Sequence, residues 1–463
     1  MGSEWEVHPL EDCMDAIIDY RGKTPKKTSF GVPLITAKII KNGIILPVAE
    51  YIAEKDYEFW MSRGIPKPGD IVITTEAPLG EVAQLDYRKI ALAQRVITLR
   101  GKKDFLDNRF LKYLILSEYV QHQLDVRGTG TTVKGIKQSE LRKIKLKFPP
   151  YSEQKAIAHI LGTLDDKIEL NRQMNSTLES MAQAMFKSWF VDFDPVIDNA
   201  LAAGNPIPES LKARAENRRR LGDQRKTLTQ EIQQQFPSRF VLSEELGWIP
   251  EGWGIGCFGD FAQHIRANVK AENVGDADFY IGLEHIGKKL LFLTGSGAGK
   301  SVESNKSGFQ KRDLLFGKLR PYFHKVCLAP CEGICSTDIL VFRAKQAFSQ
   351  SYMTLTAFSE EFVDYANMRS TGTRMPRASA KDMLGYVVTM PNKEILIYFE
   401  EKIKPIWEKG MYSAENSTHL TNFRDTLLPK LISGQLRLPD SLIEKFAEQA
   451  NSHDAEQIIS EAI

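Results

Sequence analysis

The stretch R-G-T-G-T at Arg127–Thr131 is repeated as R-S-T-G-T at Arg369–Thr373. The offset is 242 residues, the difference between 369 and 127, and the same offset separates Pro149 from Pro391. A helical pattern follows each proline. The repeated unit is therefore far longer than the period of a solenoid, and it ends in one long helix.

The repeat extends toward the start of each half with a drifting offset. The run Gly69–Ile73 resembles Arg312–Phe316 at an offset of 243, and Trp5 corresponds to Trp253 at an offset of 248. Loops of different length account for the drift. Two copies of an α/β domain followed by a long helix predict a pseudo-twofold molecule with two similar working surfaces, which suits a ligand that offers two similar sites.

The first repeat begins with a mixed, mostly β domain over residues 5–150. Short apolar runs such as Ile71–Ile73 and Val96–Leu99 are bounded by Gly, Pro and Asn, which is typical of strands. One amphipathic helix is predicted over Asn108–Leu124. We expect two prolines to end the last strand and Ser152 to cap the long helix that follows.

Apolar residues recur at a 4-3 spacing over Ile157–Trp189, with Asn171 and Asn175 in the middle. A second seam over Phe399–Leu431, 242 residues later, is small or polar in its middle. We expect the two helices to pair with each other, antiparallel if a twofold axis relates the repeats. A helix of about 36 residues is about 54 Å long and would act as a rigid spacer. The alternative is an ordinary helical hairpin that packs a core.

The segment between the first helix and the second repeat has no counterpart in the C-terminal copy. Asp194–Pro195 and Gly204–Pro208 are expected to break the chain, and residues 209–235 are charged and compatible with a helix. We interpret this segment as a linker that wraps around the helices.

Composition limits the class of protein. The chain has 463 residues, a net charge of +2 and 42% hydrophobic residues, enough for two or three domains. It contains no apolar run of the roughly 20 residues that span a membrane and no signal peptide at Met1, so we expect a cytoplasmic protein. Cys327, Cys331 and Cys335 lack the spacing of a zinc site and are expected to be reduced cysteines around a strand turn at Pro330.

Positive charge is concentrated at matching places in the two repeats. Residues 127–147 carry seven Lys and Arg against Glu140 alone, residues 365–381 carry four, and a third group lies over residues 311–325. A solvated surface is the ordinary explanation of one such run. Because the runs recur within Gly- and Thr-rich loops, contact with phosphates is favoured.

Two motifs suggest chemistry that the surrounding sequence does not support. Thr294–Ser301 nearly matches a phosphate-binding loop, but it lacks the first glycine and continues as a loop instead of a helix. Phe148–Tyr151 resembles the motif of amino-methyltransferases, but Phe148 has no acceptor for the amine of an extruded base. Neither a glycine-rich turn for a methyl donor nor a catalytic triad is apparent.

The paired Gly/Thr loops remain as the candidate site. Gly and Thr let a backbone approach a phosphate, whereas Arg can also read guanine in the major groove. A mere turn rich in Gly and Thr is the alternative. The candidate DNA-binding residues are Arg127, Thr129, Thr131, Thr132, Lys134, Lys318, Arg320, Arg369, Thr371, Thr373, Arg374 and Arg377.

Nearly the whole chain resembles the DNA-specificity (S) subunits of Type I restriction–modification enzymes. The resemblance is carried by the loops R-G-T-G-T-T at Arg127–Thr132 and R-S-T-G-T-R at Arg369–Arg374, and by F-P-P-Y-S-E-Q-K at Phe148–Lys155. It also rests on the helical stretches Leu178–Phe190 and Arg424–Gly434.

The resemblance implies an α+β fold in which two antiparallel coiled-coil helices separate two pseudo-twofold-related, mixed α/β target-recognition domains. Each domain would read one half of a split, asymmetric DNA site, and the helices would set the gap. The expected boundaries are 1–150 and 247–392 for the recognition domains, 151–195 and 393–434 for the helices, 196–246 for the linker and 435–463 for the tail.

The resemblance also implies partners. Two modification subunits would bring S-adenosylmethionine chemistry, two restriction subunits would bring ATP and Mg²⁺, and this chain would hold no cofactor and catalyse nothing. Apolar residues at the helix ends exceed what one helix partner covers, so we expect an exposed patch that docks the modification subunits. These residues are Met185, Phe186, Trp189, Phe190, Leu427, Leu428, Leu431 and Ile432.

Two other classes of protein stay open at this point. One is a fused methyltransferase–specificity enzyme, which S-adenosylmethionine binding by the isolated chain would reveal. The other is a coiled-coil scaffold that binds only protein, for which salt-sensitive binding to a split-site duplex would be contrary evidence.

Overall fold

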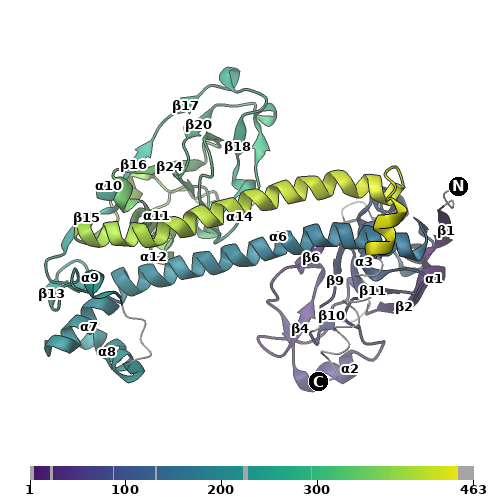
Figure 1. The fold of residues 1–463 in the computed structure, drawn as a ribbon, viewed down its shortest axis with the longest axis horizontal. Coiled ribbons are helices and arrows are strands. Elements are labelled where there is room, and N and C mark those ends of the chain that lie inside the picture. The colour runs from purple at the N-terminus through teal and green to yellow at the C-terminus, as the bar shows by residue number, and fades with distance from the viewer. Residues whose placement is uncertain are drawn as a thin grey trace. The chain divides into compact units, whose positions relative to one another are not determined.

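The computed structural model describes residues 5–20, 24–86, 88–130, 133–222, 228–293, 295–372 and 374–446. The chain divides into two units (Figure 1). Unit 1 consists of Met1–Lys167 and Leu420–Ile463, and unit 2 is Ile168–His419. Each unit therefore contains one α/β domain and one segment of each long helix.

The core of unit 1 is an antiparallel sheet in the order β2-β11-β8-β9. A smaller sheet has the order β10-β4-β7-β3, and β1 pairs with β12. The strands are β1 Glu6–Pro9, β2 Met14–Asp19, β3 Lys27–Thr28, β4 Val32–Ile35, β7 Tyr51–Ile52, β8 Ile71–Thr75, β9 Leu79–Gln84, β10 Ala91–Leu92, β11 Val96–Gly101 and β12 Lys145–Phe148. The hairpin of β5 Ile40–Lys41 and β6 Ile44–Ile45 forms a separate two-stranded sheet beside β9.

Unit 2 repeats the main sheet and the separate β1–β12 strand pair of unit 1 but has a different side sheet. Its main sheet has the order β16-β24-β21-β22, and β15 pairs with β25 as β1 pairs with β12. A side sheet has the order β17-β20-β23-β18-β19. The strands are β15 Gly254–Cys257, β16 Ala262–Ile265, β17 Asn268–Val269, β18 Phe279–Ile281, β19 Gly297–Ala298, β20 Lys306–Phe309, β21 Leu314–Gly317, β22 Val326–Leu328, β23 Gly333–Cys335, β24 Ile339–Ala344 and β25 Val387–Met390.

One ion pair is the same in both main sheets. Asp70 accepts two hydrogen bonds of 2.7 Å from Arg100, and Asp313 accepts bonds of 2.7 and 2.8 Å from Arg343. Both carboxylates are buried, and each also accepts a backbone N–H from the preceding turn. The extra bonds offset the cost of burying the charge. Asp70 and Asp313 belong to the two runs whose similarity first indicated the repeat.

The helix expected over residues 108–124 is two helices, α3 Asn108–Leu116 and α4 Glu118–Arg127. The break lies at Ser117, which has extended backbone and whose side chain accepts the Val120 N–H. A serine that caps a new helix overrides a continuous apolar pattern. Ser359 separates α11 Gln350–Phe358 from α12 Glu360–Met368 in the same way.

The two long helices are α6, Tyr151–Phe186, and α14, Lys393–Ser433 (Figure 1). Within unit 2, Asn171 donates a hydrogen bond of 3.0 Å to Asn416, and the Ser413 hydroxyl lies 3.5 Å from the Met174 sulfur. Residue numbers thus rise along one helix as they fall along the other, so the predicted antiparallel pairing with adjacent polar middles is confirmed. Ser152 is not the cap, since α6 already begins at Tyr151.

In unit 1 the long helices are attached to the domain through Asp165 of α6. This carboxylate accepts bonds of 2.6 Å from Lys112 and from Tyr113, both on α3, and a bond of 2.8 Å from Arg424 of α14. Removing Asp165 would leave buried Lys112 without its carboxylate, and such a loss typically costs about 3–5 kcal/mol because the remaining charge is unpaired.

The matching position in unit 2 is apolar. Trp407, 242 residues after Asp165, is fully buried and donates a hydrogen bond of 2.9 Å to the Ser351 hydroxyl. Phe292 packs against Trp407. Gly410 leaves space for the Phe292 ring, because a Cβ at position 410 would lie 1.9 Å from that ring. The two domains are therefore attached to the helices by different chemistry.

The linker contains helices that the sequence pattern did not predict. After α6 a π-helical turn spans Lys187–Val191, and α7 spans Asp194–Ala203. Asp194–Pro195 starts this helix instead of breaking the chain, since proline fits a first helical turn. The expected charged helix is α8, Glu209–Leu221. The linker also contains α9 Gln230–Gln233 and β13 Phe240–Ser243, and β13 pairs with β14 Gly247–Pro250 just after it.

The cysteines lie as expected on either side of a strand turn. Cys327 is on β22 and Cys335 on β23, and both are buried. Burial raises the pKa of the Cys335 thiol to about 12, so it stays protonated. Within the described ranges no group of His, Cys, Asp and Glu has the arrangement of a metal site. None of the described helices is long and apolar enough to cross a membrane.

A buried carboxylate predicts a pH-dependent stability. Glu179 of α6 accepts backbone N–H groups of Leu291 and Phe292 at 2.8 and 3.1 Å, and burial raises its pKa from 4.5 to about 7. The folded chain therefore binds a proton between these values that the unfolded chain releases, and stability falls as pH rises from 4.5 to 7.

Glu179→Gln keeps the acceptor oxygen and cannot ionise. We expect the variant to lose less stability than the wild type between pH 5 and 8, by on the order of 3 kcal/mol. Urea unfolding of both proteins across this range measures the difference. Parallel curves for the two proteins would contradict the assignment.

Candidate nucleic-acid interface

The first Gly/Thr loop is closed by two reciprocal backbone hydrogen bonds. The Thr129 N–H donates to the Gly135 carbonyl at 2.8 Å, and the Gly135 N–H donates to Thr129 at 2.9 Å. Gly130 has a φ of 114°, and a Cβ there would lie 2.2 Å from the Val133 carbonyl oxygen. Only glycine fits this turn without strain.

The second loop has the same closure. Thr371 and Arg377 exchange backbone hydrogen bonds of 3.1 and 2.9 Å, and Gly372 has a φ of 101°. Each of these three residues lies 242 positions after its counterpart in the first loop. The sequence repeat is therefore a repeat of backbone geometry.

Both loops are bonded to the same end of their main sheets. Gly135 bridges to Glu76, just after β8, and the Ile136 N–H donates to the Thr75 carbonyl at 2.9 Å. In unit 2, Arg377 bridges to Leu319, just after β21. The Ala378 N–H donates to Lys318 at 3.0 Å, and the Arg320 N–H donates to Pro376 at 2.8 Å. Lys318 and Arg320 are thereby brought beside the second loop.

The candidate side chains of unit 1 lie on or beside its loop. Arg127 ends α4, is half-buried, and donates to Glu140 at 3.1 Å. A hydrogen bond from Lys143, with a contribution from Arg127, lowers the pKa of Glu140. Thr129 is exposed, and exposed Lys134 pairs with Asp125. The predicted residues Thr131 and Thr132 lie outside the described residues.

The candidate side chains of unit 2 lie on its loop. Arg369, Thr371, Arg374 and Arg377 are exposed, and the Arg369 guanidinium lies 5.5 Å from the centre of the Tyr365 ring. Thr373 lies outside the described residues.

Lys318 and Arg320 are half-buried beside this group. The buried Arg320 Nε has no hydrogen-bond partner among the described residues. Burial and then the positive charges of Arg266 and Lys318 lower the pKa of His264, which indicates a positive field at this end of the sheet.

Comparisons with known proteins agree with this arrangement. Residues 2–180 match the family model of the Type I restriction modification DNA specificity domain. The chain is 26% identical over 454 residues to the Type I restriction enzyme MjaIX specificity subunit of Methanocaldococcus jannaschii, and the match covers 94% of each chain. It is 26% identical over 413 residues to the HindI specificity subunit of Haemophilus influenzae, covering 80% of this chain and 87% of that one.

The chain is therefore similar, over nearly its whole length, to the specificity subunits of Type I restriction–modification systems. Its fold is similar to the crystal structure of the Type I system S subunit from M. genitalium, with a TM-score of 0.52 at 15% identity. That match covers 92% of this chain and 96% of the other. The resemblance proposed from the sequence motifs is thereby confirmed.

Sequence reasoning missed three charged residues at the same end of the main sheets. Arg95 lies 3.6 Å from Glu76 in unit 1, and Asp338 lies 3.1 Å from Arg377 in unit 2. Arg95 and Asp338 occupy matching positions, because their carbonyls accept the Thr75 and Lys318 N–H groups at 3.0 and 2.9 Å. The offset of 243, already visible in the β8 motif, could have located them.

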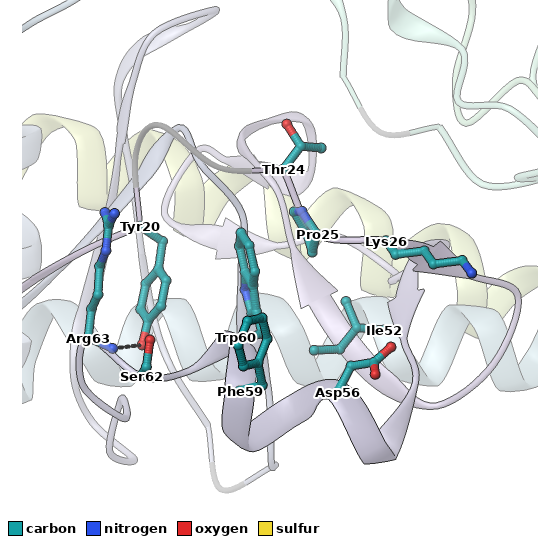
Figure 2. Close-up of a pocket in the computed structure, with 10 residues that line it drawn as sticks. All are labelled: Tyr20, Thr24, Pro25, Lys26, Ile52, Asp56, Phe59, Trp60, Ser62 and Arg63. Carbon is teal, nitrogen blue, oxygen red and sulfur yellow. Dashed lines mark hydrogen bonds between the residues drawn. The ribbon is translucent and has the colours of Figure 1, made fainter.

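A hollow of about 450 Å³ in unit 1 was also missed (Figure 2). Tyr20, which follows β2, donates to the Gly64 carbonyl at 2.6 Å and accepts the Arg63 N–H at 3.0 Å. Phe59 is 84% exposed at its edge. No apolar periodicity marks this site. Its lining residues are Tyr20, Thr24, Pro25, Lys26, Ile52, Asp56, Phe59, Trp60, Ser62 and Arg63.

The prediction that the eight apolar residues at the helix ends form an exposed docking patch is wrong, because these residues are buried or partly buried. Trp189 and Phe190 are only 3% and 4% exposed, and Phe190 packs against Trp253 and Phe399 in the core of unit 2. In unit 1 the core contains Leu431 and Ile432. The other four residues, Met185, Phe186, Leu427 and Leu428, are partly buried against these cores.

The prediction of an exposed patch was wrong because it assumed that only the other long helix covers these residues. The α/β domain of unit 2 and the linker residues Ile232 and Phe236 belong to the same core as Trp189 and Phe190. The helix ends therefore have a structural role in each unit, and the docking assignment loses the exposed surface on which it rested.

Loop closure predicts the effect of a single methyl group. In Gly130→Ala the new Cβ would meet a backbone oxygen at 2.2 Å, so the Thr129–Gly135 bonds should open. We expect faster hydrogen exchange at the loop amides with unchanged exchange in β8, and a loss of stability of about 1–3 kcal/mol. Gly295→Ala is the matched control, because its Cβ would meet nothing within 4 Å. Equal hydrogen exchange at the loop amides in the two variants would contradict the interpretation that the loop conformation requires glycine at position 130.

Proposed function

We propose that this specificity subunit binds DNA at a split, asymmetric site and that each unit reads one half-site. One observation carries the proposal. The same loop, closed by the same two backbone bonds, is attached to the same end of the main sheet in both units. A duplex with two separated half-sites is the ligand that such duplicated basic surfaces suit.

The loops supply suitable chemistry for a DNA backbone. Exposed Thr129 and Thr371 carry hydroxyl groups, and Arg127 and Arg369 add positive charge beside them. Contacts of this kind fix the register of a protein on a duplex, and base contacts then supply the specificity. The side chains beside the loops differ between the units, since Arg95 of unit 1 and Asp338 of unit 2 occupy matching positions, and this difference supports two different half-site sequences.

We further propose that the helices set the gap between the half-sites. Both α6 and α14 run from one unit into the other. At about 1.5 Å per residue, the 36 residues of α6 span about 54 Å. The Asn171–Asn416 bond is a polar contact within the seam, and such contacts fix the register of paired helices.

The chain acts in this proposal as a non-catalytic subunit. Modification subunits supply S-adenosylmethionine chemistry, and restriction subunits supply ATP- and Mg²⁺-dependent chemistry, two of each. The relatives named as specificity subunits support this over a fused methyltransferase or a scaffold that binds only protein.

The first functional test separates phosphate contact from base reading at the loops. Arg127→Ala and Arg369→Ala should each weaken DNA binding by the complete complex. If the side chain meets a phosphate, all sequences weaken alike and the salt slope falls by about one. If it reads a base, discrimination at one position relaxes by about 1–3 kcal/mol. Arg172→Ala on α6 serves as the control, and wild-type affinity in both loop variants would refute the assignment.

The second test lengthens the spacer without disturbing the helix seam. One heptad is added to each helix at the unit boundary, after Lys167 and after His419. Seven residues extend a helix by about 10 Å, close to the rise of three base pairs of B-DNA. The gap in the methylated site should therefore grow by about three base pairs while both half-sites stay the same. Methylome sequencing determines both the half-sites and the gap. An unchanged gap would contradict the proposal that the helices set the distance between the half-sites.

A further inference from the structure

An acidic side chain lies next to each basic loop. In unit 1 Glu76 follows β8, bridges to the loop through its backbone, and pairs with Arg95 at 3.6 Å. In unit 2 Asp338 pairs with Arg377 of the loop itself at 3.1 Å. All four side chains are 30–47% exposed. A carboxylate on a surface that faces phosphates is repelled by them, so its presence there needs another reason.

Support of the fold is not that reason. The structural pairs Asp70–Arg100 and Asp313–Arg343 have buried carboxylates and the same residue types at matching positions in both sheets. The pairs at the loop end are partly exposed, and they are built differently: Asp338 stands where Arg95 stands in unit 1, whereas Arg377 stands where Gly135 does. Exposed pairs of this kind contribute little to stability.

The major-groove edge of a G·C pair matches such a side-chain pair. Guanine presents two neighbouring acceptors, N7 and O6, and cytosine presents the N4 donor beside them. Arg donates two N–H groups to the guanine, and a carboxylate accepts from the cytosine. O6 and N4 are about 3 Å apart, as hydrogen-bonded atoms are, and the side-chain pairs have a similar separation. An A·T pair offers acceptor, donor, acceptor and does not fit.

We propose that Glu76–Arg95 and Asp338–Arg377 each read one G·C base pair, one in each half-site. The Arg binds guanine O6 and N7, and the carboxylate binds cytosine N4 of the same pair. This inference rests on the proposed DNA-reading function and adds the residues and the base pair to it. The rigid position of each pair at a strand end suits this role, since readout requires a fixed donor and acceptor geometry.

The test uses the complete complex of this chain with its modification subunits. Methylome sequencing first defines the wild-type site, which should contain a G·C pair in each half. Glu76→Ala and Asp338→Ala, which remove the acceptor oxygens, are then compared with the wild type by fluorescence anisotropy. The probes are the cognate duplex and duplexes changed at one base pair at a time.

Each variant should lose discrimination at a single G·C position of its own half-site, by about 5- to 150-fold. The other half-site should be read as before. A mere surface ion pair predicts the opposite pattern, because loss of a negative charge would then raise affinity for every duplex and change no preference. Asp86→Ala is the matched control: Asp86 also pairs with an arginine, Arg88, but lies at the other end of the sheet.

The outcomes separate the two proposals. Sequence-specific wild-type binding with full discrimination retained in both variants would overturn the base-reading role alone. A wild-type half-site without any G·C pair would do the same. Absence of sequence-specific binding by the wild-type complex would overturn the DNA-reading function and this inference together.

Discussion

Pairing between α6 and α14 is the interaction on which both units depend. Each unit contains one segment of each helix, so neither domain completes its core with the helix of its own repeat alone. Leu431 and Ile432 of the second repeat are buried in the core of unit 1, together with Leu161 of the first. Ala182 of the first repeat is buried in the core of unit 2. Separation of the helices would expose apolar surface in both units, which couples the folding of one unit to the folding of the other.

The helix pairing and the loops could be predicted because they depend on local spacing. A 4-3 apolar seam and a repeated R-x-T-G-T each specify geometry within a few residues, and the offset of 242 carried one loop onto the other. The break at Ser117 could also have been found, since serine followed by Glu118 is a common start of a helix. The prediction of one continuous helix followed the apolar pattern and not this helix-start signal.

Burial of the helix ends could not be predicted from the pattern. Trp189 and Phe190 have an apolar pattern that fits an exposed patch as well as a core, and only the packing of distant segments decides between these. Phe236 comes from the linker and Trp253 from the second repeat, yet both lie in the same core as Phe190. Side-chain pairs such as Arg95 with Glu76 were missed for the same reason. Their partners are brought together by strand register, which a single sequence does not display.

Comparison of the two repeats separates framework from function. Asp70 and Asp313 are equivalent and have equivalent arginine partners, as expected for groups that hold a sheet together. The helix attachments differ in chemistry, with half-buried Asp165 in one unit and fully buried Trp407 in the other, but both hold the long helices to a domain. The charges at the loop ends differ while staying exposed. A position that varies between repeats, stays at the surface and is held by backbone bonds is free to respond to a ligand without disturbing the fold.

Rigidity explains why the candidate reading residues lie at strand ends. A side chain on a freely moving loop loses conformational entropy when it binds, and this loss subtracts from the affinity of every sequence alike. The reciprocal bonds at Thr129 and Thr371 fix the backbone in advance, and the bridges to Glu76 and Leu319 tie each loop to its main sheet. Binding then requires little reorganisation of the backbone. A mismatched base pair cannot be accommodated by movement of the loop, so the cost of an unsatisfied donor or acceptor is expressed fully as discrimination.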